Sequence, residues 1–318
     1  MTFSSIFAQQ KLIKPPYLQK GDTIAIVAPA GILKNKQEII LKAKKLAESW
    51  GLKVVLGRHL FNQNNHFSGT DEERCQDFQV ALDNKNIKAI WSARGGYGSV
   101  RILDLLDFTE FKKNPKWVIG YSDITAFHNH IHNLGVETIH GMMGTSLGDD
   151  LKDIKETVTS FKKALFGKAM RYTISASKYN RVAFLKEIEG QIIGGNLSIL
   201  ASMLGSDSQL NTSGKILFIE EIGEYKYSMD RMLQSLKRAG YFTRVKAVVV
   251  GNMSRVKKNS TAWGSSIEQL ILDVVPENVP VLFDFPAGHE LDNRALIFGR
   301  SVRLIVGNEE YSLVFKEI

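Results

Sequence analysis

The strongest constraint on the fold of this 318-residue chain is an alternation in its first half. Short apolar runs at 21–31, 87–93 and 116–120 alternate with longer segments in which apolar residues recur at helical spacing. Strands that alternate with helices in this way indicate a mostly parallel sheet with helices on both faces. The first half therefore reads as an α/β domain.

The pattern changes from about residue 151. An amphipathic helix ending at Gly167 is followed by a segment with little periodicity, and apolar runs at 214–224 and 244–252 then flank a helical pattern at 228–240. Another helical pattern near 263–275 precedes a tail rich in β-forming residues. These segments predict a second unit that is smaller and richer in strands.

We therefore expect an α/β protein of two domains. The N-terminal domain (1–168) holds the mostly parallel sheet with flanking helices, residues 169–188 form a linker, and the C-terminal domain (189–318) is a β-rich α/β unit. A chain of this length can bury two substantial cores.

A serine follows the apolar run at 116–120, in the sequence GYSDIT, and precedes a helical pattern. Ser122 can cap that helix, because a serine hydroxyl accepts one of the unpaired N–H groups of a first turn. It can also be a nucleophile on a strand–turn–helix elbow, where the N–H of the next residue, Asp123, points at a developing oxyanion. The match to G-x-S-x-G is incomplete because position 124 is isoleucine. Both readings stay open on these residues alone.

A nucleophilic serine needs a base and an acid that orients the base. The candidate base is His289, in a loop with the sequence FPAGHE, although a partly buried loop histidine is the simpler reading. The candidate acids are Glu220 and Glu221, at the carboxyl end of a predicted buried strand, where α/β proteins bind ligands. The residues alone do not choose between these two acids.

The glycine-rich segment ARGGYG (93–98) joins a predicted strand to a predicted helix. It lacks the lysine of a Walker motif and the spacing of a dinucleotide fingerprint. The N–H groups of Gly95 and Gly96 can supply half of an oxyanion hole, or the glycines can serve a tight turn that needs positive φ.

The histidines and the single cysteine of the sequence do not predict a metal, a disulfide or another cofactor site. Histidines at 128, 130 and 132 cannot converge from one helix, and no H-E-x-x-H pattern accompanies the pair at 128 and 132, so we expect no metal. The single cysteine, Cys75, lies at helical spacing from Phe78, which predicts a core residue and no disulfide.

Composition narrows the possible partners. The formal net charge of +8 is spread over scattered lysine pairs without a basic stripe, so we expect no nucleic-acid partner. No apolar run reaches 18 residues, so we expect no membrane span.

Six motifs in fixed order carry a family resemblance: FSGTDEER, ARGGYG, GYSDIT, GGNLSIL, LFIEEIGEYKYSMDRMLQSL and FPAGHELDN. Together they resemble the serine-type LD-carboxypeptidases, whose sister branch is the microcin-immunity peptidases, from about residue 20 to 305. The resemblance implies a triad of Ser122, Glu220 and His289 split between two domains. It also implies oxyanion donors at the N–H of Asp123 and at the Gly95–Gly96 turn.

The resemblance further implies a function. The expected reaction is hydrolysis of the L,D bond that releases the terminal D-alanine of a murein tetrapeptide, in a cytoplasmic homodimer without a metal. Two alternatives stay open: a microcin-immunity-type peptidase acting on peptidyl or aminoacyl nucleotides, and a non-catalytic module that binds cell-wall peptides. Two departures from the family pattern are HGMMG (140–144), which lacks the usual Gly-Pro, and IFG (297–299), which replaces a proline turn.

Tryptophan positions favour the murein substrate. A nucleobase is well held by an aromatic face, and the resemblance places a stacking tryptophan of the nucleotide-cleaving branch between the nucleophile and the acid. The stretch from Ser122 to Glu220 contains no tryptophan. Other rings of this stretch offer a weaker platform: Phe161, Tyr172, Tyr179 and Phe184.

The N-terminal sequence MTFSSIFAQQ bears on the compartment. It lacks the basic region and the long apolar stretch of a signal peptide, which favours the cytoplasm. Its ending resembles a cleavage region, so export of the native protein stays open.

Overall fold

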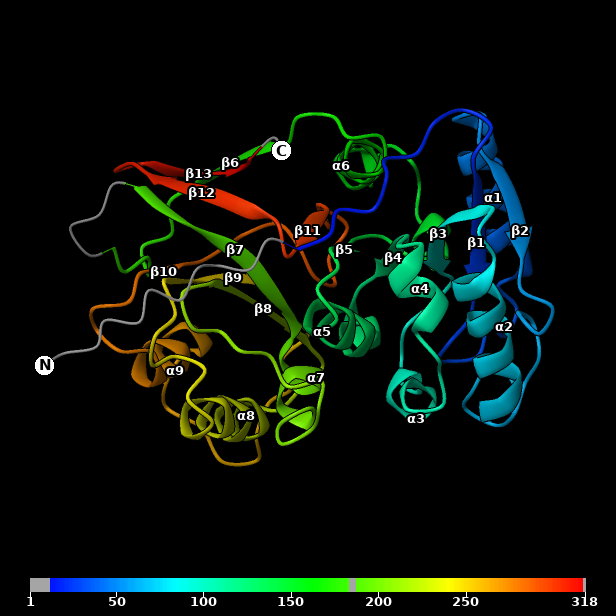
Figure 1. Cartoon of the computed structure of the whole chain (residues 1–318). Helices are drawn as coiled ribbons and strands as arrows, with labels where there is room; N and C mark the ends of the chain where they lie inside the picture. The colour runs from blue at the N-terminus through cyan, green and yellow to red at the C-terminus, as the bar shows by residue number, and fades with distance from the viewer. Residues whose placement is uncertain (1–11, 183–186, 317–318) are drawn as a thin grey trace, which may run out of the picture.

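The computed structural model describes residues 12–182 and 187–316 and contains two sheets, each with helices packed against it (Figure 1). This two-domain α/β architecture confirms the predicted fold class, whereas the residue bounds of the domains stay a prediction. The N-terminal sequence MTFSSIFAQQ and the ring of Phe184 lie outside the described residues.

The first sheet has six strands in the order β11-β5-β4-β3-β1-β2. The predicted mostly parallel sheet is confirmed, because its first five strands in sequence pair in parallel: β1 (Thr23–Val27), β2 (Lys53–Leu56), β3 (Ile87–Ser92), β4 (Trp117–Gly120) and β5 (Thr138–His140). The short strand β5 was not predicted from the sequence. Its helices are α1 (Gln37–Ser49), α2 (Asp71–Asp83), α3 (Ser99–Leu103), α4 (Thr109–Lys113), α5 (Thr125–Asn133) and α6 (Lys155–Leu165), with short 3-10 turns η1 (Ser122–Ile124) and η2 (Gly144–Gly148).

The second sheet has seven strands in the order β10-β9-β8-β7-β12-β13-β6. Strands β7 to β10 pair in parallel and the remaining pairs are antiparallel: β6 (Arg171–Ser175), β7 (Glu187–Asn196), β8 (Ile216–Ile222), β9 (Ala247–Ser254), β10 (Val281–Leu282), β12 (Ser301–Val306) and β13 (Glu310–Phe315). The helices α7 (Leu197–Ser202), α8 (Lys226–Arg238) and α9 (Ile267–Val274) lie together on one side of this sheet (Figure 1).

Local sequence explains where α2 begins. The Thr70 hydroxyl accepts a hydrogen bond from the N–H of Glu73 at 3.2 Å, and the Glu73 carboxylate accepts one from the N–H of Thr70 at 2.9 Å. This reciprocal capping box pairs two of the N–H groups that a first turn leaves unsatisfied. Phe78 is fully buried on the inner face of the helix, whereas Cys75, predicted as a core residue, is only half-buried against the same core.

The C-terminal tail contributes a strand to the first sheet, which the sequence did not predict. β11 (Leu296–Phe298) pairs antiparallel with β5, so that Leu296 lies opposite His140. The chain then passes to the second sheet, where the N–H of Gly299 donates to the carbonyl of Ile192 at 2.7 Å. The IFG segment is thus a crossing between the two sheets.

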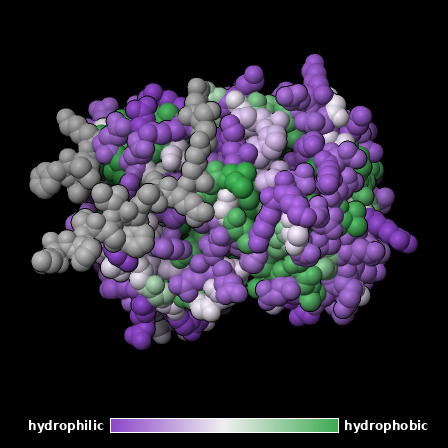
Figure 2. Space-filling view, viewed as in Figure 1, coloured by the Kyte–Doolittle hydropathy of each residue, from purple (hydrophilic) through white to green (hydrophobic). Residues whose placement is uncertain are grey.

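The face drawn in Figure 2 is mostly hydrophilic, with small hydrophobic areas scattered over it. This matches the dispersed charge of the sequence. Across the described ranges, no helix has the length and apolar character that crossing a bilayer requires.

Candidate active site

Ser122 lies in a tight turn between β4 and α5, with a backbone φ of +61°. A positive φ is unusual for a residue other than glycine and costs about 1–2 kcal/mol. Within the described part of the chain, the Ser122 hydroxyl makes no hydrogen bond, and neither η1 nor α5 has a side-chain cap. The structure therefore does not use Ser122 as a helix cap.

Glu220 and His289 form a direct pair. The Glu220 side chain is fully buried at the end of β8, and its Oε2 accepts a hydrogen bond from Nδ1 of His289 at 2.7 Å. The ring of His289 is held by this bond, so that its Nε2 is the nitrogen left for other chemistry.

Glu221 lies on the other side of β8 and serves a different purpose. Its carboxylate accepts hydrogen bonds from the N–H of Ser198 at 2.7 Å and from the Asn196 side chain at 3.2 Å, at the start of α7. Burial is the main cause that raises the pKa of Glu221 to about 7, and the neighbouring charge of Glu220 contributes to this rise. Of the two candidate acids, only Glu220 contacts His289.

Ser122 and His289 come from different domains, and residues near Ser122 in the sequence contact the C-terminal domain. The ring of Tyr121, which precedes Ser122, is 5.0 Å from the His289 ring between centroids. The Thr125 hydroxyl accepts a hydrogen bond at 3.0 Å from the N–H of Asn196, which pairs with Glu220 in the sheet register. Among described residues, no hydrogen bond joins Ser122 to His289, and such bonds are often long in unliganded enzymes.

The glycine-rich segment packs directly against Ser122. A Cβ atom on Gly95 would lie 3.3 Å from the Cβ of Ser122, and Gly96 has a φ of +103°. The Gly95 carbonyl accepts from the N–H of Gly31 at 3.0 Å, whereas the N–H groups of Gly95 and Gly96 have no acceptor in the described part of the chain. The glycines thus make a tight turn and leave N–H groups next to the serine.

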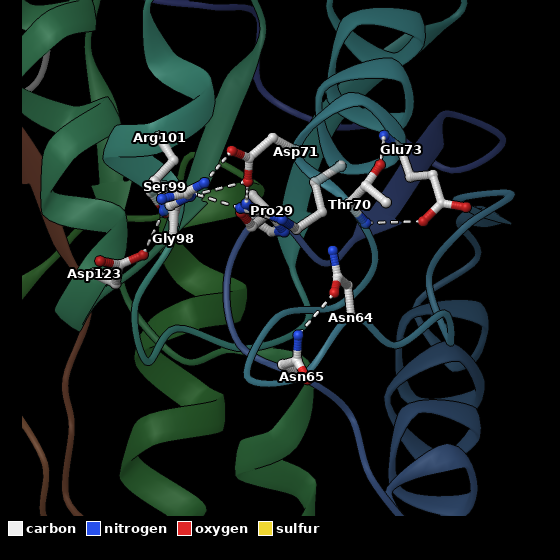
Figure 3. Close-up of polar contacts among 11 residues, drawn as sticks. Pro29, Asn64, Asn65, Thr70, Asp71, Glu73, Gly98, Ser99, Arg101 and Asp123 are labelled. Atoms are coloured by element: carbon white, nitrogen blue, oxygen red, sulfur yellow. Dashed lines mark hydrogen bonds and ion pairs between the residues drawn. The ribbon is translucent and has the colours of Figure 1, made fainter.

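Asp123 connects this elbow to the glycine-rich segment (Figure 3). Its buried carboxylate accepts a hydrogen bond from the N–H of Ser99 at 2.8 Å, at the start of α3. Burial raises the pKa of the Asp123 carboxyl group, and hydrogen bonds from Ser99 oppose this shift. The backbone that carries the candidate oxyanion donors is therefore tied together at a buried point.

A buried arginine holds the end of the same segment. Arg74 is 1% exposed and donates to the carbonyl of Gly98 at 2.9 Å and to the carbonyl of Pro29. Asp71 bonds to Arg74 and also accepts two hydrogen bonds from Arg101, at 2.6 and 3.0 Å (Figure 3). These contacts fix α2, α3 and the glycine-rich segment relative to one another.

Sequence reasoning did not assign Arg74 a role. The available signal was its place four residues before Phe78, which puts a charged side chain on the buried face of a helix. A charge in such a position requires partners. The partners themselves are backbone carbonyls of distant segments, and a sequence pattern does not identify those.

The three histidines of α5 point to separate partners. His128 donates to the carbonyl of Gly120 at 2.9 Å, His130 contacts the Ser208 hydroxyl at 3.0 Å, and His132 contacts Lys215 Nζ at 2.9 Å. Burial lowers the pKa of His128 to about 4. In residues 12–182 and 187–316, no group of three or more His, Cys, Asp or Glu side chains is arranged to hold a metal ion.

His140, next to the departing HGMMG segment, is completely buried among the aromatic rings of Tyr121, Phe218 and Phe298. Burial lowers its pKa well below the ordinary value. An uncharged cluster of rings therefore packs against Tyr121, the residue before Ser122.

Both halves of the chain match known family models. Residues 24–141 match the LD-carboxypeptidase N-terminal domain, and residues 189–304 match the LD-carboxypeptidase C-terminal domain. The chain belongs to the LD-carboxypeptidase family. A probable murein peptide carboxypeptidase of Bacillus subtilis is 37% identical over 87% of this chain and 86% of its own length.

Solved structures give the same relationship. Muramoyltetrapeptide carboxypeptidase from Oxalobacter formigenes has a TM-score of 0.83 at 29% identity, covering 93% of this chain and 99% of that chain. MccF in complex with glutamyl sulfamoyl guanosine has a TM-score of 0.84 at 25% identity, covering 96% and 99% of the two chains. The two neighbours represent the two branches that the sequence motifs resemble.

The arginine contacts predict a specific loss of stability. Changing Asp71→Asn removes the negative charge beside buried Arg74, and we expect the free energy of unfolding to fall by about 1–3 kcal/mol. Asp83→Asn is the matched control, because Asp83 is exposed at the end of the same helix and, among described residues, bonds to the side chain of Gln79 alone. Urea unfolding measures both changes, and equal losses in the two variants would contradict this role.

Proposed function

We propose that this protein is a serine-type LD-carboxypeptidase that releases the terminal D-alanine from murein tetrapeptides. The observation that carries the proposal is the 2.7 Å hydrogen bond between His289 and fully buried Glu220, beside a serine at positive φ. A base that is already oriented, together with a serine hydroxyl that bonds to no described residue, is the arrangement that nucleophilic catalysis requires.

In the proposed mechanism, Nε2 of His289 takes the proton of the Ser122 hydroxyl as its oxygen attacks the carbonyl carbon of the scissile bond. Glu220 holds the imidazole and stabilises the imidazolium that forms. The N–H of Asp123 and those of the Gly95–Gly96 turn donate to the tetrahedral oxyanion. His289 then gives its proton to the nitrogen of the leaving D-alanine, and water releases the acyl group from Ser122 by the same route.

The substrate class rests on the relatives. The Bacillus subtilis relative is described as a murein peptide carboxypeptidase and the Oxalobacter formigenes neighbour as a muramoyltetrapeptide carboxypeptidase. A murein stem offers carboxylates and amides, and this chain carries a formal net charge of +8. The proposal requires no metal and no cofactor.

The nucleotide-cleaving alternative depends on a ring that can stack on a base. Trp50, Trp91 and Trp117 are at most 8% exposed, so they are occupied by the core. Trp263 is 37% exposed but follows Glu220 in the sequence. The stretch between Ser122 and Glu220 thus offers no tryptophan, which favours the murein peptide over a nucleotide-linked peptide.

The proposal includes a homodimer in the cytoplasm, which rests on the resemblance of the motifs to the family. Light scattering of the purified protein tests whether it is a homodimer. Fractionation of cells that express the gene with its native upstream region tests the cytoplasmic location, and a periplasmic pool would overturn that location.

Replacing Ser122→Ala or His289→Ala should lower kcat for D-alanine release by about a thousandfold or more, because the proposed nucleophile or base is lost. Ser202→Ala is a matched control on an exposed helical serine. Circular dichroism should show an intact fold in all three variants. A fully active Ser122→Ala protein, or activity that a chelator abolishes, would contradict the serine mechanism.

The choice between branches is tested by competing substrates. The protein should show a higher kcat/KM on a murein tetrapeptide than on an aminoacyl sulfamoyl adenylate, because no tryptophan platform for the base lies in the expected stretch. An equal or higher kcat/KM on the adenylate would reverse the assignment. Binding of the tetrapeptide without any release of D-alanine would favour the non-catalytic module.

A further inference from the structure

A cavity of about 330 Å³ lies beside His289 and has no role in the mechanism above. Its walls come from the end of β9, the first part of α9 and the loop that carries His289, and they include Pro286 and Glu290 on either side of that residue. This will be called the acidic cavity.

The acidic cavity is close to the Glu220–His289 pair. A Cβ atom on Gly288 would lie 3.1 Å from Oε2 of Glu220 and 3.3 Å from Oδ1 of Asn252, and Asn252 lines the cavity. The backbone at Gly288 is therefore next to both the pair and the cavity wall.

The acidic cavity has a charge opposite to the net charge of the whole chain. Four carboxylates and no lysine, arginine or histidine line the cavity: Glu268, Asp284, Glu290 and Asp292. Asp292 is paired with Arg294 at 2.9 Å, whereas the other three carboxylates form no ion pair with any described residue. On a chain with a formal net charge of +8, such a surface selects for a positively charged group.

Unpaired acceptors give independent support. Ser254 lines the cavity and is 4% exposed, yet its hydroxyl has no hydrogen-bond partner within the described ranges. Oδ1 of Asn252, in the same wall, is also buried without a partner there. A buried polar atom without a partner costs about 1–3 kcal/mol, and a ligand that donates hydrogen bonds removes this cost.

The arrangement does not suit a metal ion. The cavity side chains are not among any described group of three or more His, Cys, Asp or Glu residues arranged around one ion. Acceptors spread around a larger space suit an ammonium group at the end of a flexible chain, because it carries three donors and a full charge.

We propose that the acidic cavity binds the ammonium group on the side chain of the substrate residue whose carbonyl Ser122 attacks. This inference rests on the proposed function, in which that residue is the third of a murein stem. Lysine and diaminopimelate, the residues found at that position, both have a long side chain that ends in an amine. In the proposed mechanism the carbonyl is next to His289, so the side chain of the same residue starts close to Gly288, near the cavity wall.

The test compares two tetrapeptides that differ only at the third residue. One carries lysine and the other norleucine, which keeps the carbon chain and lacks the amine. We expect kcat/KM to be about tenfold or more higher for lysine, as one charge-assisted hydrogen bond implies. The difference should lie in KM, because the ammonium contact is the same before and during the reaction.

The double variant Asp284→Asn with Glu290→Gln should bring the lysine-to-norleucine ratio close to one. Both side chains are exposed and their replacements have the same shape, so the norleucine substrate reports the folding of each variant. Glu309→Gln removes one exposed carboxylate outside the cavity and should keep the ratio of the unchanged protein.

The other outcomes distinguish a failure of this proposal from a failure of the proposed function. Equal kcat/KM for the two substrates in the unchanged protein would overturn the proposal while leaving the proposed function in place. A double variant that keeps the lysine preference, or a Glu309→Gln control that loses it, would also overturn the proposal. Release of D-alanine from neither substrate would instead contradict the proposed function itself.

Discussion

The hydrogen bond from His289 to buried Glu220 is the interaction on which the rest of the site depends. A carboxylate without solvent contact is costly unless it is paired, and His289, from a later loop of the same domain, is its partner. The loop that carries His289 must therefore be fixed. Thr157 and Ser160 of α6 do this, since they bond to the backbone of that loop: Leu291 at 2.6 Å, Asn293 at 2.7 Å and Ala295 at 3.0 Å.

A site divided between two domains works only if the domains do not move apart. Strand β11 meets this need by leaving the second domain to pair with β5 of the first sheet. The ion pair of Arg300 with Glu137, in which both side chains are at most 3% exposed, closes the same crossing. Thr125 and Asn196 join the two domains a second time, directly beside Ser122 and Glu220. The chain segment that crosses between the domains and the buried polar contacts together hold the two domains in the arrangement that the proposed catalysis needs.

The sequence predicts the local features of this arrangement and misses its long-range contacts. Periodicity identified most of the parallel strands, although not β5, and the spacing of Thr70 and Glu73 identified the start of α2. It did not separate Glu220 from Glu221, because neighbours in a strand face opposite sides and the choice depends on partners far along the chain. It missed β11, because three apolar residues within a β-rich tail carry no information about which sheet they join. The role of Arg74 depends on backbone carbonyls that meet only in the folded protein.

The central claim is that the acyl group of the substrate is transferred to Ser122. An ester analogue of the tetrapeptide, with D-lactate in place of the terminal D-alanine, has a better leaving group and should allow an acyl-enzyme to accumulate. Rapid quenching followed by mass spectrometry should find the tripeptide acyl group on the peptide that contains Ser122. Turnover of the ester with the acyl group on another residue, or with no adduct at any quench time, would contradict the account.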